Sequence, residues 1–325
     1  MFLLDPVIFP WDLAILVLMA AGLGIAVVAR VWIRRHRSSR WWQKTFVGFL
    51  GLFGLLGFFT VSYGSFVEPQ IIRVTRAQVG MPVRQPLKIV VLSDFHVGPF
   101  KGERFVRRIV QRANALLPDI VLIAGDYTYD DRSDLSALEP LRDLRASLGV
   151  YAVLGNHDAG FYLSLRGEPF HQRDMSDELS RALTDMEITV LRNEHVLRYV
   201  GNDNLAIAGI DDVWMEGSSV EQSLEGIPEH TPTMLLAHSP DVVLDPQSGR
   251  ADLIVVGHTH GGQVRLPWWG AVPMLPTRIG KQYDQGLFAV DDDTTMAVTR
   301  GLGETLVRAR LLAWPEILLI EGKPR

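Results

Sequence analysis

Two long apolar segments near the amino end constrain this chain more than any other feature of its sequence. Leu13 to Val31 is almost uninterrupted apolar sequence, and a second such run extends from about Phe46 to Val67. Each is close to the roughly 20 residues that a helix needs to cross a bilayer. Cleavable signal peptides begin with a basic segment, whereas residues 1–29 contain no Lys or Arg. We therefore predict two retained membrane helices, with buried core helices of a soluble domain as the alternative.

The short loop between the two runs is strongly basic and indicates how the chain is oriented. Basic loops tend to stay on the cytoplasmic side of a membrane, and Trp41 and Trp42 suit the headgroup layer. Only Arg73 and Arg76 compete nearby, after the second run. We therefore expect both termini, and the domain that follows the helices, on the extracytoplasmic side. The basic residues of the loop region are Arg30, Arg34, Arg35, Arg37, Arg40 and Lys44.

Composition excludes several other classes of protein. The 325 residues include no cysteine, so the chain has no disulfide bond and no thiolate that binds metal or acts as a nucleophile. The formal net charge of −5, with basic residues scattered beyond the first loop, indicates no nucleic-acid partner. We expect a membrane anchor over residues 1–67, a linker or an opening edge strand over residues 68–86, and a catalytic domain over residues 87–325.

From Leu87 onward, short branched apolar runs alternate with segments whose apolar residues recur at helical spacing. Strands that alternate with helices are typical of a layered α/β domain whose parallel strands are buried on both faces. We predict two sheets packed together with helices outside. The last three strands lack intervening helices, which predicts a second, largely antiparallel sheet. The predicted strands span residues 89–92, 120–124, 150–154, 205–210, 234–237, 253–256, 287–290, 295–299 and 316–320, and the predicted helices span residues 105–117, 138–148 and 177–185.

Five polar clusters follow five of the predicted strands, and every cluster supplies Asp, Asn or His. Open α/β sheets bind ligands beyond the carboxyl ends of their strands, so we expect these side chains to converge. Singly, most of these patterns are common turns, whereas the ordered set of five is specific. The clusters are Ser93-Asp94-Phe95-His96, Gly125-Asp126, Gly155-Asn156-His157-Asp158, Ala237-His238-Ser239 and Gly257-His258-Thr259-His260-Gly261-Gly262.

The residue types in these clusters indicate a transition-metal site. Imidazole and carboxylate together suit Zn, Mn and Fe, whereas oxygen-only cages suit Ca or Mg. Alternate residues of an extended chain point the same way, so Asp94 and His96 can chelate one ion. By the same spacing, His258 and His260 can face one pocket. Glycines that let the chain turn sharply and approach a metal closely precede Asp126, Asn156 and His258.

Together, these residues resemble the calcineurin-like metallophosphoesterase family, and the resemblance covers about Leu87 to Glu321. Ala237 precedes His238 where many members have Gly or Ser, although the ligand itself is kept. The resemblance implies two mixed β-sheets packed as a sandwich and flanked by helices, here preceded by two transmembrane helices. The chain is most similar to the bacterial branch at the inner membrane, a multi-pass localisation, because of Gly-His-Thr-His-Gly-Gly-Gln263-Val264-Arg265-Leu266-Pro267 and Arg300-Gly301-Leu302-Gly303.

The resemblance also implies roles for individual residues. Two divalent ions, Mn, Fe or Zn rather than Mg, would activate water and clamp the phosphoryl group, so no protein nucleophile is required. His157, which is not expected to bind metal, would protonate the leaving oxygen, and Asp158 would orient His157. Asp94, His96 and His260 would hold the first ion, Asn156, His238 and His258 would hold the second, and Asp126 would bridge the two.

Two further features bear on the substrate. Arg265 and Arg300 could pair with a substrate phosphate, although exposed arginines usually form surface ion pairs. An apolar run from Leu266 to Leu275, which contains Trp268 and Trp269, follows the last metal cluster. This run either packs under a neighbouring loop or dips into the bilayer, where Trp favours the headgroup level.

The favoured function is hydrolysis, at the membrane, of a lipid-linked or envelope phosphoester, with the chain acting as a phosphodiesterase. Related family members imply a runner-up, pyrophosphate cleavage of a nucleotide-linked diacylated sugar, the lipid A precursor, although that cytoplasmic substrate conflicts with the expected topology. A soluble nucleotide or general phosphodiester is another alternative. From a different class comes a non-catalytic, metal-stabilised envelope protein, which would have no use for His157 in the pocket. Fold alone does not choose among these substrates.

Overall fold

The structure, a computed structural model, describes residues 9–163, 168–201, 203–272 and 274–325. The chain divides into two compact units. The helical unit comprises the residues up to Ile71 together with Thr305–Leu312. The α/β unit comprises Ile72–Glu304 and Ala313–Arg325, so its last strand follows a segment that belongs to the helical unit.

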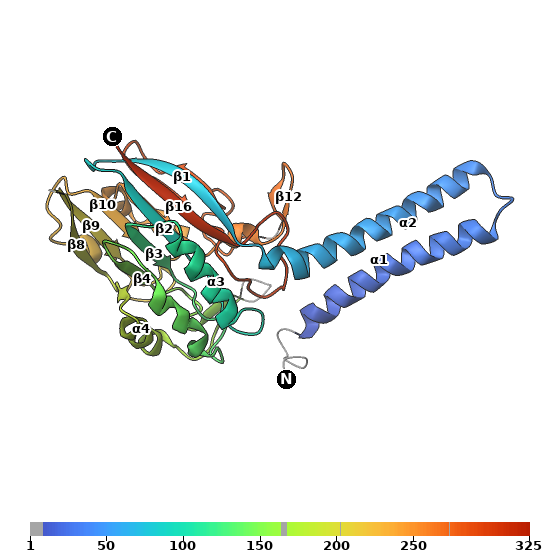
Figure 1. Cartoon of the computed structure of the whole chain (residues 1–325), viewed down its shortest axis with the longest axis horizontal. Helices are drawn as coiled ribbons and strands as arrows, with labels where there is room; N and C mark the ends of the chain where they lie inside the picture. Colours follow the sequence, from blue (N-terminus) through green and yellow to red (C-terminus); the bar gives the residue numbers. More distant parts are fainter. Residues whose placement is uncertain (1–8, 164–167, 202, 273) are drawn as a thin grey trace. The chain divides into compact units, whose positions relative to one another are not determined.

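Two long helices form a hairpin in the helical unit (Figure 1). Helix α1 spans Phe9–Arg35 and helix α2 spans Trp41–Ser62, so the basic loop lies at the turn between them. Both helices are long and apolar enough to cross a membrane. Most of their large apolar side chains are exposed, which is not the pattern that core helices of a soluble domain show.

Glycines let α1 and α2 approach each other closely. A Cβ atom on Gly54 would lie 2.5 Å from the carbonyl oxygen of Gly22, and a Cβ atom on Gly22 would lie 2.7 Å from that of Gly54. Small residues at such positions favour helix pairing in lipid because the backbones can pack directly. After α2 the chain continues as a π-helical turn, η2 (Tyr63–Val67), and a 3-10 turn, η3 (Glu68–Gln70).

The first sheet of the α/β unit has six strands in the order β1-β16-β2-β3-β4-β7. Strands β2, β3, β4 and β7 run parallel to one another, whereas β16 pairs antiparallel with β2 and parallel with β1. Of the two structures left open for residues 68–86, the edge strand is present as β1. The strands are β1 (Arg73–Met81), β2 (Leu87–Leu92), β3 (Ile120–Ala124), β4 (Val150–Val153), β7 (Thr189–Val190) and β16 (Glu316–Pro324).

The second sheet is mixed, with the order β14-β15-β11-β10-β9-β8. Its three central pairings are parallel, and only the outer strands β14 and β8 pair antiparallel with their neighbours. The prediction of a largely antiparallel second sheet is therefore wrong, and residues 316–320 belong to the first sheet. Local alternation does not encode which distant strand is the partner. The strands are β8 (Glu194–Val200), β9 (Asp203–Gly209), β10 (Thr233–Leu236), β11 (Leu253–Val256), β14 (Gly286–Ala289) and β15 (Thr295–Val298).

Three apolar layers hold the α/β unit together. Between the two sheets, side chains such as Ile89 of β2 pack in one cluster with side chains such as Ile207 of β9. Helices α3 (Glu103–Asn114) and α4 (Ser176–Asp185) pack on the outer face of the first sheet. Helix α5 (Val220–Leu224) covers the second. This arrangement confirms the predicted sandwich of two mixed sheets flanked by helices.

The predicted helix over residues 138–148 is wrong. The chain forms a 3-10 helix, η4 (Leu135–Asp143), and continues without regular structure to the next strand. Pro140 lies inside this segment, and proline disrupts an α-helix because it lacks the amide hydrogen and its ring clashes with the preceding turn. The remaining short elements are β5 (Phe161–Leu163), β6 (Pro169–His171), η5 (Pro240–Leu244), η6 (Pro246–Arg250), η7 (His260–Gly262), β12 (Arg265–Leu266) and β13 (Gly270–Ala271).

Candidate metal centre

The polar clusters lie together at the carboxyl ends of the central strands of both sheets. Parallel strands bring their carboxyl ends to one edge of a sheet, and the two sheets face each other across a common apolar layer. The loops after β2, β3 and β4 therefore meet the loops after β10 and β11. Seven predicted metal-ligand residues come from these loops, and all of them are buried: Asp94, His96, Asp126, Asn156, His238, His258 and His260.

The first group of donor atoms belongs to Asp94, His96 and His260. These three residues each offer a ligand atom within 4.8 Å of the other two. The Nε2 atoms of His96 and His260 lie 3.0 Å apart. His260 Nε2 lies 3.4 Å from Asp94 Oδ1. Two nitrogens that bind one metal ion at about 2.1 Å lie about 3.0–3.4 Å from each other at octahedral or tetrahedral angles, so these spacings fit a shared cation.

The second group belongs to Asp126, His238 and His258, whose ligand atoms also lie within 4.8 Å of one another. His258 Nδ1 lies 3.0 Å from His238 Nε2. One oxygen of Asp126 reaches both groups: Oδ2 lies 3.2 Å from His238 Nε2 and 3.5 Å from His96 Nε2. This carboxylate therefore stands between the two groups, in the position that a bridging ligand would occupy.

The four histidines share one arrangement, in which one ring nitrogen faces the donor group and the other contacts a backbone carbonyl oxygen. A carbonyl can only accept, so it fixes the ring proton on the outer nitrogen and leaves the inner lone pair for a metal. These contacts join His96 Nδ1 to Thr128 O at 3.0 Å, His238 Nδ1 to Ala124 O at 2.6 Å, His260 Nδ1 to Gly303 O at 3.2 Å and His258 Nε2 to Pro276 O at 2.6 Å.

Asn156 is held in a way that leaves its oxygen available. Its Nδ2 donates a hydrogen bond of 2.7 Å to the carbonyl oxygen of Phe161, which identifies the other amide atom as Oδ1. Within the described part of the chain, Oδ1 is buried and has no hydrogen-bond partner. A buried acceptor without a partner is costly, and a cation would satisfy it.

The electrostatics of the centre also fit a metal ion. Burial lowers the pKa of both His96 and His258 to about 3, so these imidazoles are neutral and in their ligand form. For Asp126, burial opposes ionisation, but His238 and His157 hold the pKa of the carboxyl well below its usual range. Burial likewise opposes protonation of His238, yet the carboxylates of Asp126 and Asp94 raise its pKa well above the ordinary value. A divalent cation would take the place of that proton.

The backbone at the centre adopts a conformation that side chains rarely tolerate. Five of the ligand residues have positive φ angles in the left-handed region. Such strain persists only where the surrounding structure enforces it, and it is concentrated at functional sites. The angles are 53° for Asp94, 44° for His96, 55° for Asp126, 68° for His258 and 52° for His260.

Glycines make room for the two carboxylates. A Cβ atom on Gly155 would lie 2.2 Å from Asp126 Oδ1, and one on Gly257 would lie 2.6 Å from Asp94 Oδ2. These contacts confirm that the glycines before Asn156 and His258 permit close approach. Gly301 does the same for Asp94, at 2.5 Å, a role that the sequence did not reveal because this residue lies far along the chain.

The family match now identifies the fold and its centre. Residues 87–262 match the family model described as calcineurin-like phosphoesterase. The chain belongs to the calcineurin-like phosphoesterase family. It is therefore a phosphoester hydrolase, and members of this family use divalent metal ions. The matched segment includes every residue of the two donor groups.

Several curated relatives are similar over most of this chain. It is 29% identical to an uncharacterized metallophosphoesterase, YkuE, of Bacillus subtilis, over 89% of this chain and 99% of that protein. It is 25% identical to a UDP-2,3-diacylglucosamine pyrophosphatase, LpxG, of Chlamydia trachomatis, over 79% of this chain and 91% of that protein. It is 34% identical to a transmembrane protein with metallophosphoesterase domain of Danio rerio, but spans only 52% of that protein's length. These relatives, with the two apolar helices, indicate membrane association.

His157 lies beside the first donor group of this phosphoesterase. Its ring centroid is 4.6 Å from that of His96 and 4.4 Å from that of Tyr162. Its backbone amide donates to Asp126 Oδ1 at 3.0 Å, and its Nδ1 lies 2.9 Å from the carbonyl oxygen of Tyr129. The ring is half-buried, so it can meet both the donor group and a bound substrate.

Asp158 has different neighbours from those that the sequence suggested. Its Oδ2 accepts hydrogen bonds from the amides of Asp126 and Gly155, and its Oδ1 accepts from those of Tyr127 and Thr128. This carboxylate thus joins the loop after β3 to the loop after β4. The atom that faces Nδ1 of His157 is a backbone carbonyl oxygen, not Asp158.

The two candidate substrate arginines have carboxylate partners inside the α/β unit. Arg265 Nη1 donates to Asp284 Oδ2 and to Gly261 O, both at 2.7 Å. Arg300 forms an ion pair with Glu316 and donates to Thr75 Oγ1 at 2.7 Å. Both guanidinium groups therefore have structural roles, and phosphate binding by either one stays a prediction.

Trp214 is a neighbour of the centre that the sequence did not single out. Its ring lies 5.6 Å from that of His258 and 5.6 Å from that of Phe161, between centroids. Trp214 lies in the loop after β9, at the same sheet edge as the metal clusters. The strand-end rule that located the ligands could have located it too, but an isolated tryptophan carries no spacing pattern.

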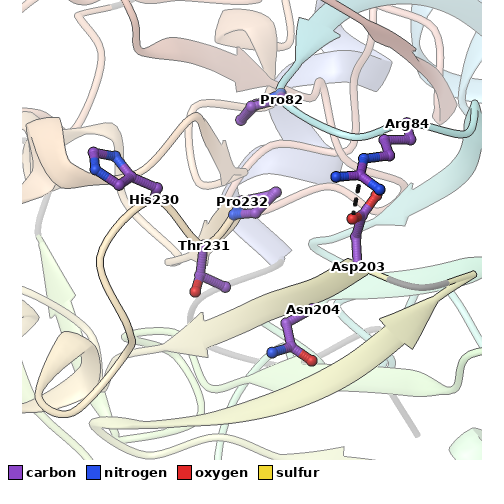
Figure 2. Close-up of a pocket in the computed structure, with 7 residues that line it drawn as sticks. All are labelled: Pro82, Arg84, Asp203, Asn204, His230, Thr231 and Pro232. Carbon is purple, nitrogen blue, oxygen red and sulfur yellow. Dashed lines mark ion pairs between the residues drawn. The ribbon is translucent and has the colours of Figure 1, made fainter.

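A separate pocket lies at the opposite edge of the second sheet (Figure 2). It is lined by residues at the amino ends of β9 and β10, and the ion pair between Arg84 and Asp203, at 3.4 Å, crosses it. Because the donor residue His238 follows the opposite, carboxyl end of β10, this pocket is remote from the metal centre. Its lining residues are Pro82, Arg84, Asp203, Asn204, His230, Thr231 and Pro232.

Proposed function

We propose that this phosphoesterase uses two divalent metal ions to hydrolyse a lipid-linked or envelope phosphoester at the membrane, as a phosphodiesterase. One observation carries the proposal of a dinuclear site: Oδ2 of Asp126 lies within 3.5 Å of a histidine nitrogen from each donor group. A single structural ion would need only one group. The mixture of imidazole and carboxylate favours Mn, Fe or Zn over Mg.

The donor groups define which residues would hold each ion. Asn156 completes the second group because its buried Oδ1 has no hydrogen-bond partner among the described residues. Its neutral amide would leave the metal pair more electrophilic than a third carboxylate would. We assign the first ion to Asp94, His96 and His260, the second to Asn156, His238 and His258, and the bridging position to Asp126.

The two ions would supply activation of a water molecule and compensation for the negative charge that grows on the phosphoryl group. The residues of the chain then have two tasks. Asp126, held by the amide of His157, keeps the two groups at a fixed spacing. His157 keeps a proton on Nδ1, where the carbonyl oxygen of Tyr129 faces it, so the second proton of the imidazolium, on Nε2, is the one that would pass to the leaving oxygen and leave the ring neutral.

Asp158 is a positioning residue in this scheme. By accepting amide hydrogens on both sides of the centre, it holds Asp126 and Asn156 on loops of fixed geometry. Preorganised ligands lower the cost of metal binding because fewer conformations are lost. This replaces the predicted role of orienting His157.

A second candidate substrate is supported by one relative. The pyrophosphatase of Chlamydia trachomatis is named for a nucleotide-linked diacylated glucosamine, and the alignment covers 91% of that protein. Both candidates join a phosphoester to acyl chains, so a lipid-borne substrate is common to them. They differ in the bond cleaved and in the side of the membrane on which the α/β unit must lie.

Topology therefore distinguishes the two candidates. We propose that the basic loop between α1 and α2 is cytoplasmic, which places the α/β unit outside the cytoplasm. A fusion after Arg325 to a phosphatase reporter that is active only when exported tests this topology. We expect that fusion to be active. A reporter active only in the cytoplasm would refute the topology and favour the nucleotide-linked substrate.

The hydrolytic activity is tested with the Mn-loaded full chain in nanodiscs. Bis-p-nitrophenyl phosphate and p-nitrophenyl phosphate share a leaving group, so they separate diester from monoester hydrolysis. We expect metal-dependent turnover of the diester that chelation abolishes. Turnover that persists without divalent metal, or hydrolysis of the monoester alone, would contradict the proposal.

A further inference from the structure

The α/β unit carries a projecting apolar surface next to the metal centre. We define the apolar hairpin by five exposed side chains on and beside β12 and β13: Leu266, Trp268, Trp269, Val272 and Met274. Trp268 is fully exposed, at 104%, and Met274 is 89% exposed. The alternative that this segment packs under a neighbouring loop is therefore wrong. Large apolar side chains gathered on a surface mark an interaction site.

The hairpin is a fixed structure and not a loose loop. The amide of Val272 donates to the carbonyl oxygen of Val264 at 2.9 Å, next to the paired strands. The side chain of Arg265, on strand β12, donates a hydrogen bond to the carbonyl oxygen of Gly261. At the turn Trp268 has a φ of 63°, an unusual conformation for a bulky residue, and its side chain is fully exposed.

The base of the hairpin is built into the metal centre. The carbonyl oxygen of Pro276 lies 2.6 Å from Nε2 of the ligand residue His258. A Cβ atom on Gly262 would lie only 2.4 Å from the Cβ atom of Ala271, so the ligand segment and the second strand of the hairpin are in direct contact. Whatever the apolar hairpin contacts is thus held close to the site of hydrolysis.

The occupant that best fits this surface is a lipid bilayer. No charged residue occurs between Arg265 and Arg278, and tryptophan is the side chain most suited to the headgroup layer. The same chain also carries two helices that are long and apolar enough to cross a bilayer. The second candidate span ends at Gln70 and the α/β unit begins at Ile72, so the chain tethers this unit directly to a membrane helix.

We propose that the apolar hairpin inserts into the headgroup layer of the bilayer that the two helices cross, and there presents a lipid-borne phosphoester to the metal centre. The second part rests on the proposed function, whereas the first does not. The surface is a docking site for lipid, and its tryptophans set the selectivity for membrane-borne over soluble substrates. The test below distinguishes lipid from a protein partner at the same surface.

The first test locates the hairpin without using activity. The chain has no cysteine, so Met274→Cys can carry a single fluorescent label in the full chain. Tyr199→Cys, 75% exposed on β8 at the other side of the α/β unit (Figure 1), is the matched control. In nanodiscs of phosphatidylethanolamine and phosphatidylglycerol, a phospholipid with a headgroup-proximal doxyl label should quench the label at position 274 and not at 199. Equal quenching at the two positions would overturn the proposal.

The second test concerns substrate delivery. Trp268→Ser combined with Trp269→Ser should remove the quenching at position 274 and lower kcat/KM about tenfold or more for a vesicle-embedded long-chain alkyl p-nitrophenyl phosphodiester, because two large apolar contacts are lost. Turnover of soluble bis-p-nitrophenyl phosphate should be unchanged. An equal loss on both substrates would overturn the delivery role. If the unaltered chain hydrolysed neither substrate, the proposed function would fail, while the quenching result would still decide the docking surface.

Discussion

The metal centre and the apolar hairpin are adjacent in the chain and depart from the ordinary burial rule in opposite directions. At the centre, histidines and carboxylates are buried and each histidine is locked by a backbone carbonyl oxygen. In the hairpin, two tryptophans and a methionine are exposed to water. Buried polar groups and exposed apolar groups both cost free energy in an isolated domain. We propose that each region is completed by something outside the chain, a pair of cations in one case and a lipid surface in the other.

Removing the shared carboxylate should have the largest effect. Asp126→Ala removes the oxygen that reaches both donor groups, so we expect loss of bound metal and a fall in kcat/KM of at least about 1,000-fold. Metal analysis of the purified chain, together with diester hydrolysis, measures both. Asp185→Ala, an exposed carboxylate, is the matched control. A variant at Asp126 that kept both ions would remove the reason for calling the centre dinuclear.

His157→Ala should separate chemistry from metal binding. Because the ring supplies a proton and no ligand in this account, the variant should keep its metal and lose about 100- to 1,000-fold in kcat. The loss should be smaller for substrates with good leaving groups, which need little protonation. His171→Gln, an exposed histidine, should leave kcat unchanged. Loss of metal in the His157 variant would move this residue into the ligand set.

A single methyl group at Gly257 should disturb the centre without removing any ligand. The added Cβ atom would lie 2.0 Å from Ser93 Oγ and 2.6 Å from Asp94 Oδ2, so Asp94 must move. We expect Gly257→Ala to weaken metal affinity about 10- to 100-fold, as loss of an outer support does at other metal sites. Gly102→Ala, where no atom lies within 4 Å, is the control for this titration. Equal affinities in the two variants would show that the ligand spacing is not tightly enforced.

Arg265→Lys should have the smallest effect, and it tests the contact between the metal centre and the apolar hairpin. Lysine keeps the charge opposite Asp284, but its flexible ammonium lacks the rigid planar geometry that holds both hydrogen bonds of the guanidinium, so the hairpin should loosen while the ligands stay in place. We expect a fall of about two- to fivefold in turnover of the vesicle-borne diester only. A fall as large as that of the His157 variant, on soluble substrate, would instead indicate direct binding of the substrate phosphate by Arg265.

The sequence allowed the centre to be predicted because its signals are local. Each ligand follows a short buried strand, and one rule about strand ends brings distant loops to one edge of the sheets. Glycines at 155 and 257 could be interpreted for the same reason. The contribution of Gly301 could not, because its proximity to Asp94 depends on how a loop far along the chain folds over the centre.

The errors in the predicted fold have the same origin. Residues 316–320 are a short, mostly apolar run, but their placement between β1 and β2 depends on pairing across more than two hundred residues of sequence. Such a run predicts a strand and not its partner. The sequence also could not predict whether the apolar run after His260 is buried or exposed, since a buried loop and a projecting hairpin can have the same composition. Only the turn at Trp268 and the contacts at its base decide it.

The central claim is that two cations share the carboxylate of Asp126. The most direct measurement is electron paramagnetic resonance of the Mn-loaded full chain, combined with metal analysis. We expect two Mn ions per chain and the spectrum of a magnetically coupled pair, which Asp126→Ala should abolish. One ion per chain, or two ions with uncoupled spectra, would contradict it.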